Sequence, residues 1–204
     1  MNLNPVVAAL LLSTTLVSAQ SVKPVVSGAS LPAEAPCPTG IPDGTRCLNG
    51  RDYLGAYYWI AVPKDWKPDT GVLVMHAHGG PALGEPTLAR ATADLQRWSV
   101  MVRAGHASAG SSFRQGGVEV LAAAEDTERL RQLTLAAIGQ PRRTVLHGQS
   151  WGASVAARMA ERYVTPDIDP RRTTPGPLPY DAVLLTSGVL AGATRAYDVR
   201  LDLR

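Results

Sequence analysis

A serine flanked by two glycines is the feature of this chain most suited to chemistry. Gly148, Ser150 and Gly152 form the pattern G-x-S-x-G in the 204-residue sequence. A serine hydroxyl at the apex of a tight turn can act as a nucleophile, and glycines leave room where side chains would crowd it. Apolar residues precede this pattern and alanine-rich residues follow it, which predicts a strand, a sharp turn and a helix. N–H groups at the start of such a helix can stabilise an oxyanion.

The segment resembles the nucleophile elbow of the α/β-hydrolase superfamily. The resemblance is carried by GQSWG, residues 148–152, between the apolar residues 144–146 and an alanine-rich helix over 153–163. It implies that Ser150 attacks an ester or amide carbonyl and forms an acyl-enzyme. It implies no metal and no organic cofactor. The alternative is that Gly148 and Gly152 only shape a turn that connects a strand to a helix.

A second motif, HGGP at residues 78–81, follows an apolar run and strengthens the resemblance. In this superfamily a loop of that kind supplies one oxyanion N–H, and the residue after the nucleophile supplies the other. The resemblance therefore implies an oxyanion hole formed by Trp151 and by Gly79 or Gly80. The alternative is a glycine-rich loop that only turns the chain.

The catalytic histidine of the superfamily follows the serine along the chain, but no histidine follows Ser150 here. His147 lies at the end of the strand before the turn, so we expect it to pack there rather than act as the base. His78 is expected to brace the oxyanion loop. His106 is assigned neither to the site nor to the core.

The triad acid is also not identified. Asp181 begins a strand, which is the wrong end for a catalytic acid, whereas Asp198 and Asp202 follow that strand. We expect residues 45–204 to be an incomplete α/β-hydrolase domain from the N-terminal part of a longer enzyme, lacking its last strands and its histidine. The alternative is a natural short form.

The resemblance implies that the partner is a small-molecule or peptide acyl substrate. The net charge of +3 comes from basic residues that occur singly or in pairs, so the sequence does not indicate nucleic-acid binding. Ester, peptide and carbon–carbon hydrolysis all stay open, because specificity lies in the cap and loops, most of which we expect to be absent from these residues.

The N-terminus predicts export to a secreted or periplasmic location. Residues 1–19 resemble a signal peptide, with a short apolar core and the small residues Val17-Ser18-Ala19 before Gln20. The apolar core is too short to span a bilayer, so we expect no stable membrane span once the signal is removed. In an oxidising compartment Cys37 and Cys47 would form a disulfide, and two free thiols are the alternative.

The remaining pattern predicts the elements that position the serine. Strands are expected at residues 53–62, 71–77, 106–110, 144–146 and 182–186, and helices at 85–104, 118–138 and 153–163. The order of these elements indicates a doubly wound, mostly parallel α/β sheet.

Three local expectations accompany this fold. Residues 20–44 are predicted to be a flexible lead-in that contains the cysteine loop. Asn49-Gly50 is predicted to form a turn. In the helix over 118–138 the charged residues are assigned to an exposed face, and the leucines to the buried one, Leu121 among them.

We therefore expect an exported serine hydrolase of the esterase or peptidase type. The 204 residues alone are expected to be nearly inactive. The alternative is a non-catalytic binding module with the same fold.

Overall fold

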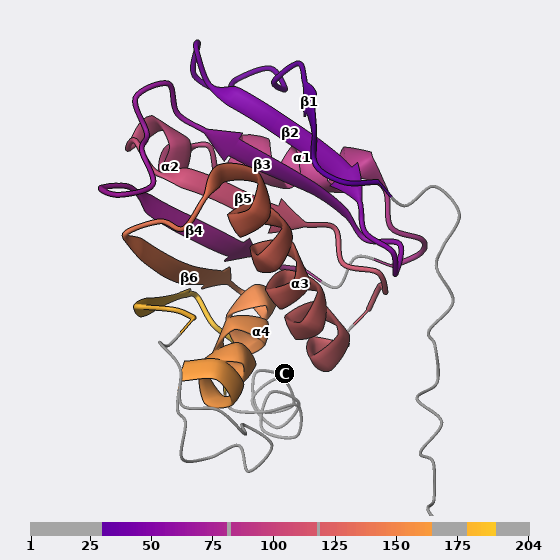
Figure 1. Ribbon diagram of the computed structural model, residues 1–204. Coiled ribbons are helices and arrows are strands. Elements are labelled where there is room, and N and C mark those ends of the chain that lie inside the picture. Colours follow the sequence, from indigo (N-terminus) through magenta and orange to yellow (C-terminus); the bar gives the residue numbers. More distant parts are fainter. Residues whose placement is uncertain (1–29, 81–82, 118, 165–178, 191–204) are drawn as a thin grey trace, which may run out of the picture.

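The structure, a computed structural model, describes residues 30–80, 83–117, 119–164 and 179–190. In these residues seven strands form one mixed sheet in the order β1-β2-β3-β5-β4-β6-β7 (Figure 1). The strands are β1 (Ala33–Ala35), β2 (Arg46–Arg51), β3 (Tyr57–Val62), β4 (Val72–Ala77), β5 (Ala107–Ser111), β6 (Arg143–Gln149) and β7 (Ala182–Thr186). The helices are α1 (Leu88–Arg97), α2 (Val100–Arg103), α3 (Val120–Ile138), α4 (Trp151–Met159) and the π-helical turn η1 (Ala160–Val164).

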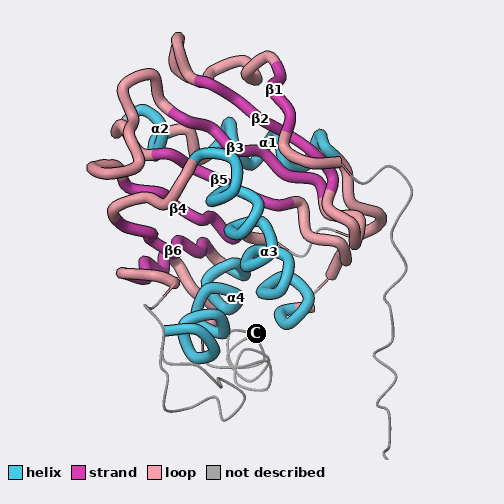
Figure 2. Tube along the Cα trace, viewed as in Figure 1, coloured by secondary structure: helices cyan, strands magenta, loops and turns pink. Residues whose placement is uncertain are grey.

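Strands β5, β4, β6 and β7 run parallel, whereas β1, β2 and β3 pair antiparallel with their neighbours. Helices α3 and α4 cover one face of the sheet, and α1 and α2 cover the other (Figures 1 and 2). Side chains of β3 alternate between two cores, with Tyr58 and Ile60 in the α3/α4 core and Trp59 and Ala61 in the α1/α2 core. The predicted doubly wound α/β class is confirmed.

The parallel strands agree with the continuous apolar runs from which they were predicted. Leu73 and Met75 of β4 and Leu146 of β6 are fully buried in the α3/α4 core. A strand covered by helices on both faces has no solvent face and so needs no alternation of polar residues. The neighbouring inner strands β4 and β6 therefore hold the starts of the loops that follow them in fixed positions.

The turn expected at Asn49-Gly50 is wrong, because both residues lie inside β2. Gly50 pairs with Tyr58, and a Cβ on Gly50 would lie 2.3 Å from the Tyr58 hydroxyl, so the glycine makes room for that side chain. The actual turn follows at Asp52. Its carboxylate Oδ1 accepts the Leu54 and Ala56 N–H groups, each at 2.9 Å. A carboxylate that bonds its own backbone in this way stabilises a turn without an Asn-Gly pair.

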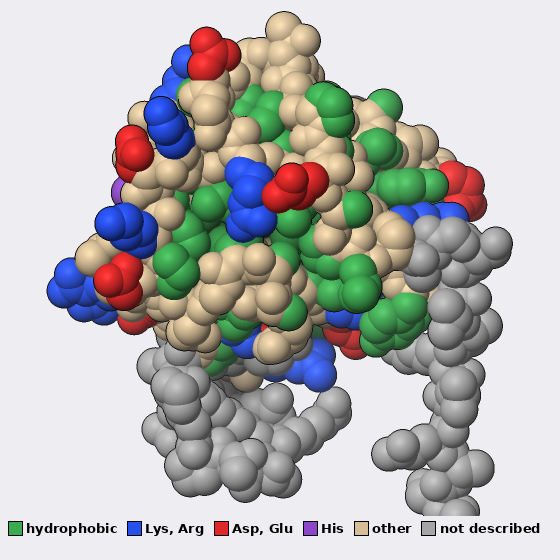
Figure 3. All heavy atoms as spheres, turned by 45° about the horizontal axis from the view of Figure 1, so that its top comes forward, with side chains coloured by type: hydrophobic (Ala, Val, Ile, Leu, Met, Phe, Trp, Pro, Cys, Tyr) green, Lys and Arg blue, Asp and Glu red, His purple; other side chains and the backbone are tan. Residues whose placement is uncertain are grey.

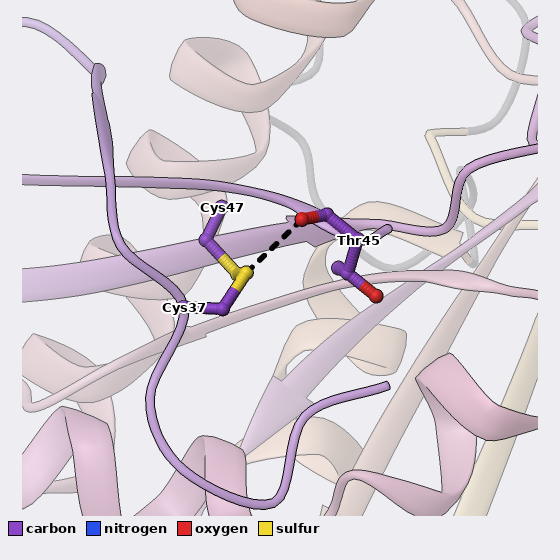
Figure 4. Close-up of a disulfide and its surroundings, with 3 residues drawn as sticks. All are labelled: Cys37, Thr45 and Cys47. Carbon is purple, nitrogen blue, oxygen red and sulfur yellow. Dashed lines mark hydrogen bonds between the residues drawn. A yellow bond between two sulfur atoms is a disulfide. The ribbon is translucent and has the colours of Figure 1, made fainter. Parts of the chain in front are cut away.

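The predicted flexible lead-in, described only from residue 30 onward, contains part of the sheet. Strand β1 pairs antiparallel with β2, and the Cys37–Cys47 disulfide predicted from the sequence joins the segment after β1 to β2 (Figure 4). Cys37 Sγ also lies 3.1 Å from the Thr45 carbonyl oxygen, which is a close contact only, since a disulfide sulfur carries no proton. A short loop closed in this way typically gains about 2–3 kcal/mol of stability. The crosslink and the β1–β2 pairing together attach residues 33–47 to the sheet.

The charged residues of α3 do not form a solvent face. Asp126 is buried, with a side chain 0% exposed, whereas Leu121 is 53% exposed. Asp126 accepts Arg114 Nη1 at 2.8 Å and also binds Arg129, which contacts Asp52 at 2.7 Å. Leu130 and Ile138, which were assigned to the buried face, are buried as expected. The assignment is wrong for Leu121 and Asp126, because Asp126 is covered by Arg114 on the β5–α3 loop and, through Arg129, is linked to the β2–β3 turn.

The surface carries charges of both signs. Figure 3 shows Lys or Arg side chains interspersed with Asp or Glu side chains on the face that it presents. Within the described segments, none of the helices is sufficiently long and apolar to cross a membrane. The signal peptide predicted over residues 1–19 lies outside the described residues.

Candidate active site

The strand-turn-helix unit around Ser150 is the centre of the candidate site. Strand β6 ends at Gln149 and α4 begins at Trp151, so Ser150 alone forms the turn. Ser150 has φ 53° and ψ −119°, a conformation that non-glycine residues rarely adopt. Strain of this kind costs on the order of 1–3 kcal/mol and persists only where the surroundings hold it. The predicted sharp turn with a serine at its apex is therefore present.

The two flanking glycines are needed because backbone lies where a side chain would be. A Cβ on Gly148 would lie 2.3 Å from the Gly152 carbonyl oxygen, and a Cβ on Gly152 would lie 2.0 Å from the Ala77 carbonyl oxygen. Both distances are far below van der Waals contact. The turn is thus packed between the end of β4 and the first turn of α4.

Strand β7 holds the turn from the other side. The Ser150 N–H donates to the Thr186 carbonyl oxygen at 2.9 Å, and the Ser150 carbonyl accepts the Ala153 N–H at 3.0 Å. The backbone of Ser150 is therefore bonded on both sides, to the last residue of β7 and to α4. These bonds can maintain the unusual backbone angles of Ser150.

The loop after β4 lies directly against Ser150. A Cβ on Gly79 would lie 3.1 Å from the Ser150 Cβ and 2.5 Å from Gln149 Oε1, and Gly80 has φ +80°. Trp151, the first residue of α4, follows Ser150 at once. The structure thus brings together the four residues that the sequence associated with nucleophile and oxyanion hole. Their chemical roles stay a prediction.

His78 braces this loop. Its ring stacks on Phe113 with centroids 4.2 Å apart, and its Nδ1 lies 3.0 Å from the Gly79 carbonyl oxygen. Because a carbonyl only accepts, that nitrogen carries the proton. The other ring nitrogen, Nε2, is buried and has no hydrogen-bond partner among the described residues.

His147 and His76 form a buried pair that the sequence did not indicate. They are neighbours in the β4–β6 register, and their Nδ1 atoms lie 2.8 Å apart. Burial, and then the nearby His76, lower the pKa of His147 to about 4, with Asp94 opposing this shift. The expectation that His147 is a packed residue agrees with its 1% exposure. A histidine inside each of two apolar strands was the available signal, but their pairing depends on a register between strands 71 residues apart.

The positions of the histidines and of Asp181 relative to Ser150 follow from the strands that carry them. In the described part of the chain, no histidine ring is hydrogen-bonded to Ser150 Oγ. His106 directly precedes β5, so it lies at the amino edge of the parallel strands, whereas Ser150 follows the carboxyl end of β6. Asp181 is also at the amino edge, where its carboxylate accepts the Thr144 N–H at 2.7 Å. Asp198 and Asp202 lie outside the described residues.

Two cavities differ in their relation to this site. One of about 460 Å³ lies between residues 83–86 and residues 114–116 with Glu119, in the loops after β4 and β5. A larger one, of about 720 Å³, lies in the disulfide segment over residues 34–47, at the far end of the strand order from β6 and β7. The first shares the carboxyl edge with Ser150 and is therefore the better candidate for substrate contact. Among the described residues, no group of three or more His, Cys, Asp or Glu is placed to hold a metal ion.

The mixed sheet, with a strained serine between a parallel strand and a helix, defines an α/β protein with a strand–turn–helix unit around Ser150. Solved structures with a similar fold are known. The chain is similar to vibralactone cyclase (TM-score 0.54, 16% identity, 72% of this chain and 44% of that one). It is similar to esterase B from Lactobacillus rhamnosis (TM-score 0.52, 17% identity, 73% of this chain and 50% of that one). It is also similar to the Francisella virulence factor BioJ (TM-score 0.50, 15% identity, 72% of this chain and 45% of that one).

These likenesses show that the chain has the α/β-hydrolase fold, as the sequence predicted. The chain spans about half the length of those structures. No protein-family model matches the sequence, and no curated protein matches it.

Proposed function

We propose that this protein is a serine hydrolase that cleaves an ester or amide bond through an acyl-enzyme on Ser150. The observation that carries the proposal is the backbone of Ser150, a non-glycine residue at φ 53° held by Thr186 and flanked by Gly79. A fold has little reason to maintain this strain for a connecting turn. Esterase B has a similar fold, which supports this reaction class.

The chemistry would proceed in two steps. Ser150 Oγ attacks the carbonyl carbon and its proton passes to a base, giving a tetrahedral intermediate that expels the alcohol or amine and leaves an acyl-serine. The Trp151 N–H and the Gly79 or Gly80 N–H would bind the oxyanion. Losing one donor of this kind typically raises the barrier by about 3 kcal/mol. Water then hydrolyses the acyl group.

The base is the missing part of this mechanism. All four histidines of the sequence lie in described segments, and each has the position given above. Residues 1–204 by themselves are therefore expected to turn over esters poorly, because the Ser150 hydroxyl has no positioned base. The same observation favours the second candidate, a non-catalytic module that binds acyl compounds at this elbow.

A cysteine at position 150 tests the elbow without depending on a histidine. A thiol reaches the thiolate form near neutral pH by itself, so S150C should be acylated by p-nitrophenyl butyrate at pH 8. S154C, on the same helix but beyond the turn, is the matched control. We expect S150C to react on the order of 10²-fold faster, since only position 150 faces oxyanion donors. Mass spectrometry of samples quenched at successive times would measure both rates, and peptide mapping would locate the acyl group.

Equal rates for S150C and S154C would contradict an oxyanion hole at this turn and would favour the binding module. A fluorophosphonate probe on the unchanged protein, with S150A as its control, then shows whether Ser150 itself is activated. Labelling at Ser150 would mean that a base activates this serine, although none is hydrogen-bonded to its hydroxyl in the described residues.

We also propose that the protein is exported. The Cys37–Cys47 disulfide supports this location, because disulfides persist in oxidising compartments. The exported protein is expected to begin at Gln20 and to carry the linked cysteine pair. Intact mass and non-reduced peptide mapping would measure both features. A mature chain that begins at Met1, or that has two alkylatable thiols, would contradict the proposal.

A further inference from the structure

A chain of polar contacts runs from the surface of α1 to the elbow. Asp94 Oδ2 lies 3.3 Å from His76 Nε2, although the two are not aligned as a hydrogen bond. His76 Nδ1 lies 2.8 Å from His147 Nδ1, and His147 Nε2 lies 3.1 Å from Thr186 Oγ1. Thr186 is the residue whose carbonyl oxygen accepts the Ser150 N–H.

This series of polar contacts, from Asp94 to Thr186, is shielded from water over most of its length. The exposed fraction is 3% for the His76 side chain and 13% for Asp94, and His147 is 1% exposed. Trp98 covers both rings, with centroids 5.0 Å from His76 and 4.7 Å from His147. Asp94 on α1 is the charged group that faces the pair. Inside a medium of low polarity such contacts must be matched donor to acceptor.

The contacts determine which atoms carry the protons. Two nitrogens 2.8 Å apart require one donor and one acceptor. If the Thr186 hydroxyl donates to His147 Nε2, then His147 Nδ1–H donates to His76 Nδ1. His76 Nε2–H then faces the Asp94 carboxylate. The opposite direction would place a bare His76 nitrogen against a carboxylate, which repels it.

We propose that Asp94, His76 and His147 are positioning residues for Ser150, because they fix the Thr186 hydroxyl as a donor and so hold the residue that anchors the Ser150 N–H. This proposal rests on the proposed function. The Asp94 charge sets the direction of the whole chain. Without that charge, the opposite direction, in which His76 donates through Nδ1, is no longer disfavoured.

Reversal changes the contacts of the elbow itself. His147 must then accept at Nδ1 and carry its proton on Nε2, which donates to Thr186 Oγ1. The freed Thr186 hydroxyl proton turns to the Gly148 carbonyl oxygen, which lies 3.4 Å away. Gly148 is two residues before Ser150, so the same chain that holds the elbow in one state bonds it differently in the other.

Nitrogen-15 NMR of the histidine rings tests the proton assignment on the unchanged protein. At pH 7 we expect a neutral His147 ring that carries its proton on Nδ1, and a proton on Nε2 of His76. D94N removes the charge that sets the direction and should shift His147 toward the Nε2–H form. T186V removes the hydroxyl at nearly constant volume and should shift the His147 Nε2 resonance, whereas T186S should restore it.

The matched control is T134V. It removes a buried hydroxyl of α3 that donates a hydrogen bond to the Leu130 carbonyl oxygen and takes no part in the contacts between Asp94 and Thr186. It should leave the His147 resonances unchanged. An Nε2–H form of His147 in the unchanged protein, or equal spectra for T186V and T134V, would overturn the proposal. These readouts do not require activity, so they fail independently of the proposed hydrolase.

The link to Ser150 is tested by acylation rates in the S150C background. Loss of one hydrogen bond in the support predicts that T186V slows acylation about threefold to tenfold, with T186S and T134V near the parent rate. If the T186V rate equals the T134V rate, the contacts between Asp94 and Thr186 only satisfy buried polar groups and do not position the nucleophile.

Discussion

Replacing Arg129 with methionine is expected to lower the free energy of unfolding by about 3–5 kcal/mol at pH 7. Arg129 lies between two buried carboxylates, at 2.7 Å from Asp52 Oδ2 and in direct contact with Asp126, whose side chains are 4% and 0% exposed. Although burial disfavours its charge, these two carboxylates hold the pKa of Arg129 above its usual value. Methionine fills similar space but leaves both negative charges without this partner.

The loss should depend on pH, because one of the carboxylates can take up a proton. Burial already raises the pKa of Asp126, with Arg114 and Arg129 opposing, and removal of Arg129 raises it further. A carboxyl whose folded pKa exceeds its unfolded value binds protons more tightly when folded, so folding is favoured as pH falls. The deficit of R129M relative to the unchanged protein is therefore expected to shrink between pH 7 and pH 4.5.

Urea unfolding at the two pH values measures this effect, with R158M as the matched control. Arg158 also pairs with a carboxylate three residues away on a helix, but the Arg158 and Glu161 side chains are 48% and 58% exposed. An exposed pair contributes about 0–1 kcal/mol. If R129M and R158M unfold at the same urea concentration, the buried network contributes little.

This network shows where prediction from sequence ends. The apolar runs of β4 and β6 and the glycines around Ser150 act locally, so they predicted the parallel sheet and the elbow from a few adjacent residues. The charges of α3 follow a helical period, but their burial depends on Asp52, 77 residues away from Arg129. No local pattern distinguishes a solvated charged face from one that another segment covers.

The candidate site divides in the same way. The sequence identified Ser150, Gly79 and Trp151 as candidates because each lies in or beside a short motif, and the spacing of such a motif reflects the local backbone geometry. Thr186 was missed because its contacts, a backbone carbonyl that accepts the Ser150 N–H and a hydroxyl beside His147, depend on the pairing of β6 with β7. The His76–His147 pair was missed because it depends on strand register, which becomes known only when β4 and β6 are paired.

Replacing Gly152 with alanine is expected to destabilise the protein by about 3 kcal/mol, at the upper end of the usual cost of overpacking. At an unobstructed helix position the same change typically stabilises by about 1 kcal/mol, because glycine is the poorer helix former. Here the new Cβ would lie 2.0 Å from the Ala77 carbonyl oxygen and 2.5 Å from that of His78. Both obstacles are backbone atoms, at the end of a central strand and just beyond it, so neither can move without shifting the sheet or the loop beside Ser150.

The displacement should reach the chemistry as well as the stability, because His78 and Gly79 lie on the loop that the new methyl group pushes away from α4. We expect a lower melting temperature for G152A and slower acylation of S150C in the same background. G105A is the control, since a Cβ there meets nothing within 4 Å and its cost comes only from φ +84°, about 1–2 kcal/mol. A G152A protein that melts higher than the unchanged chain would mean that the close packing of the elbow against β4 is not as the structure shows it.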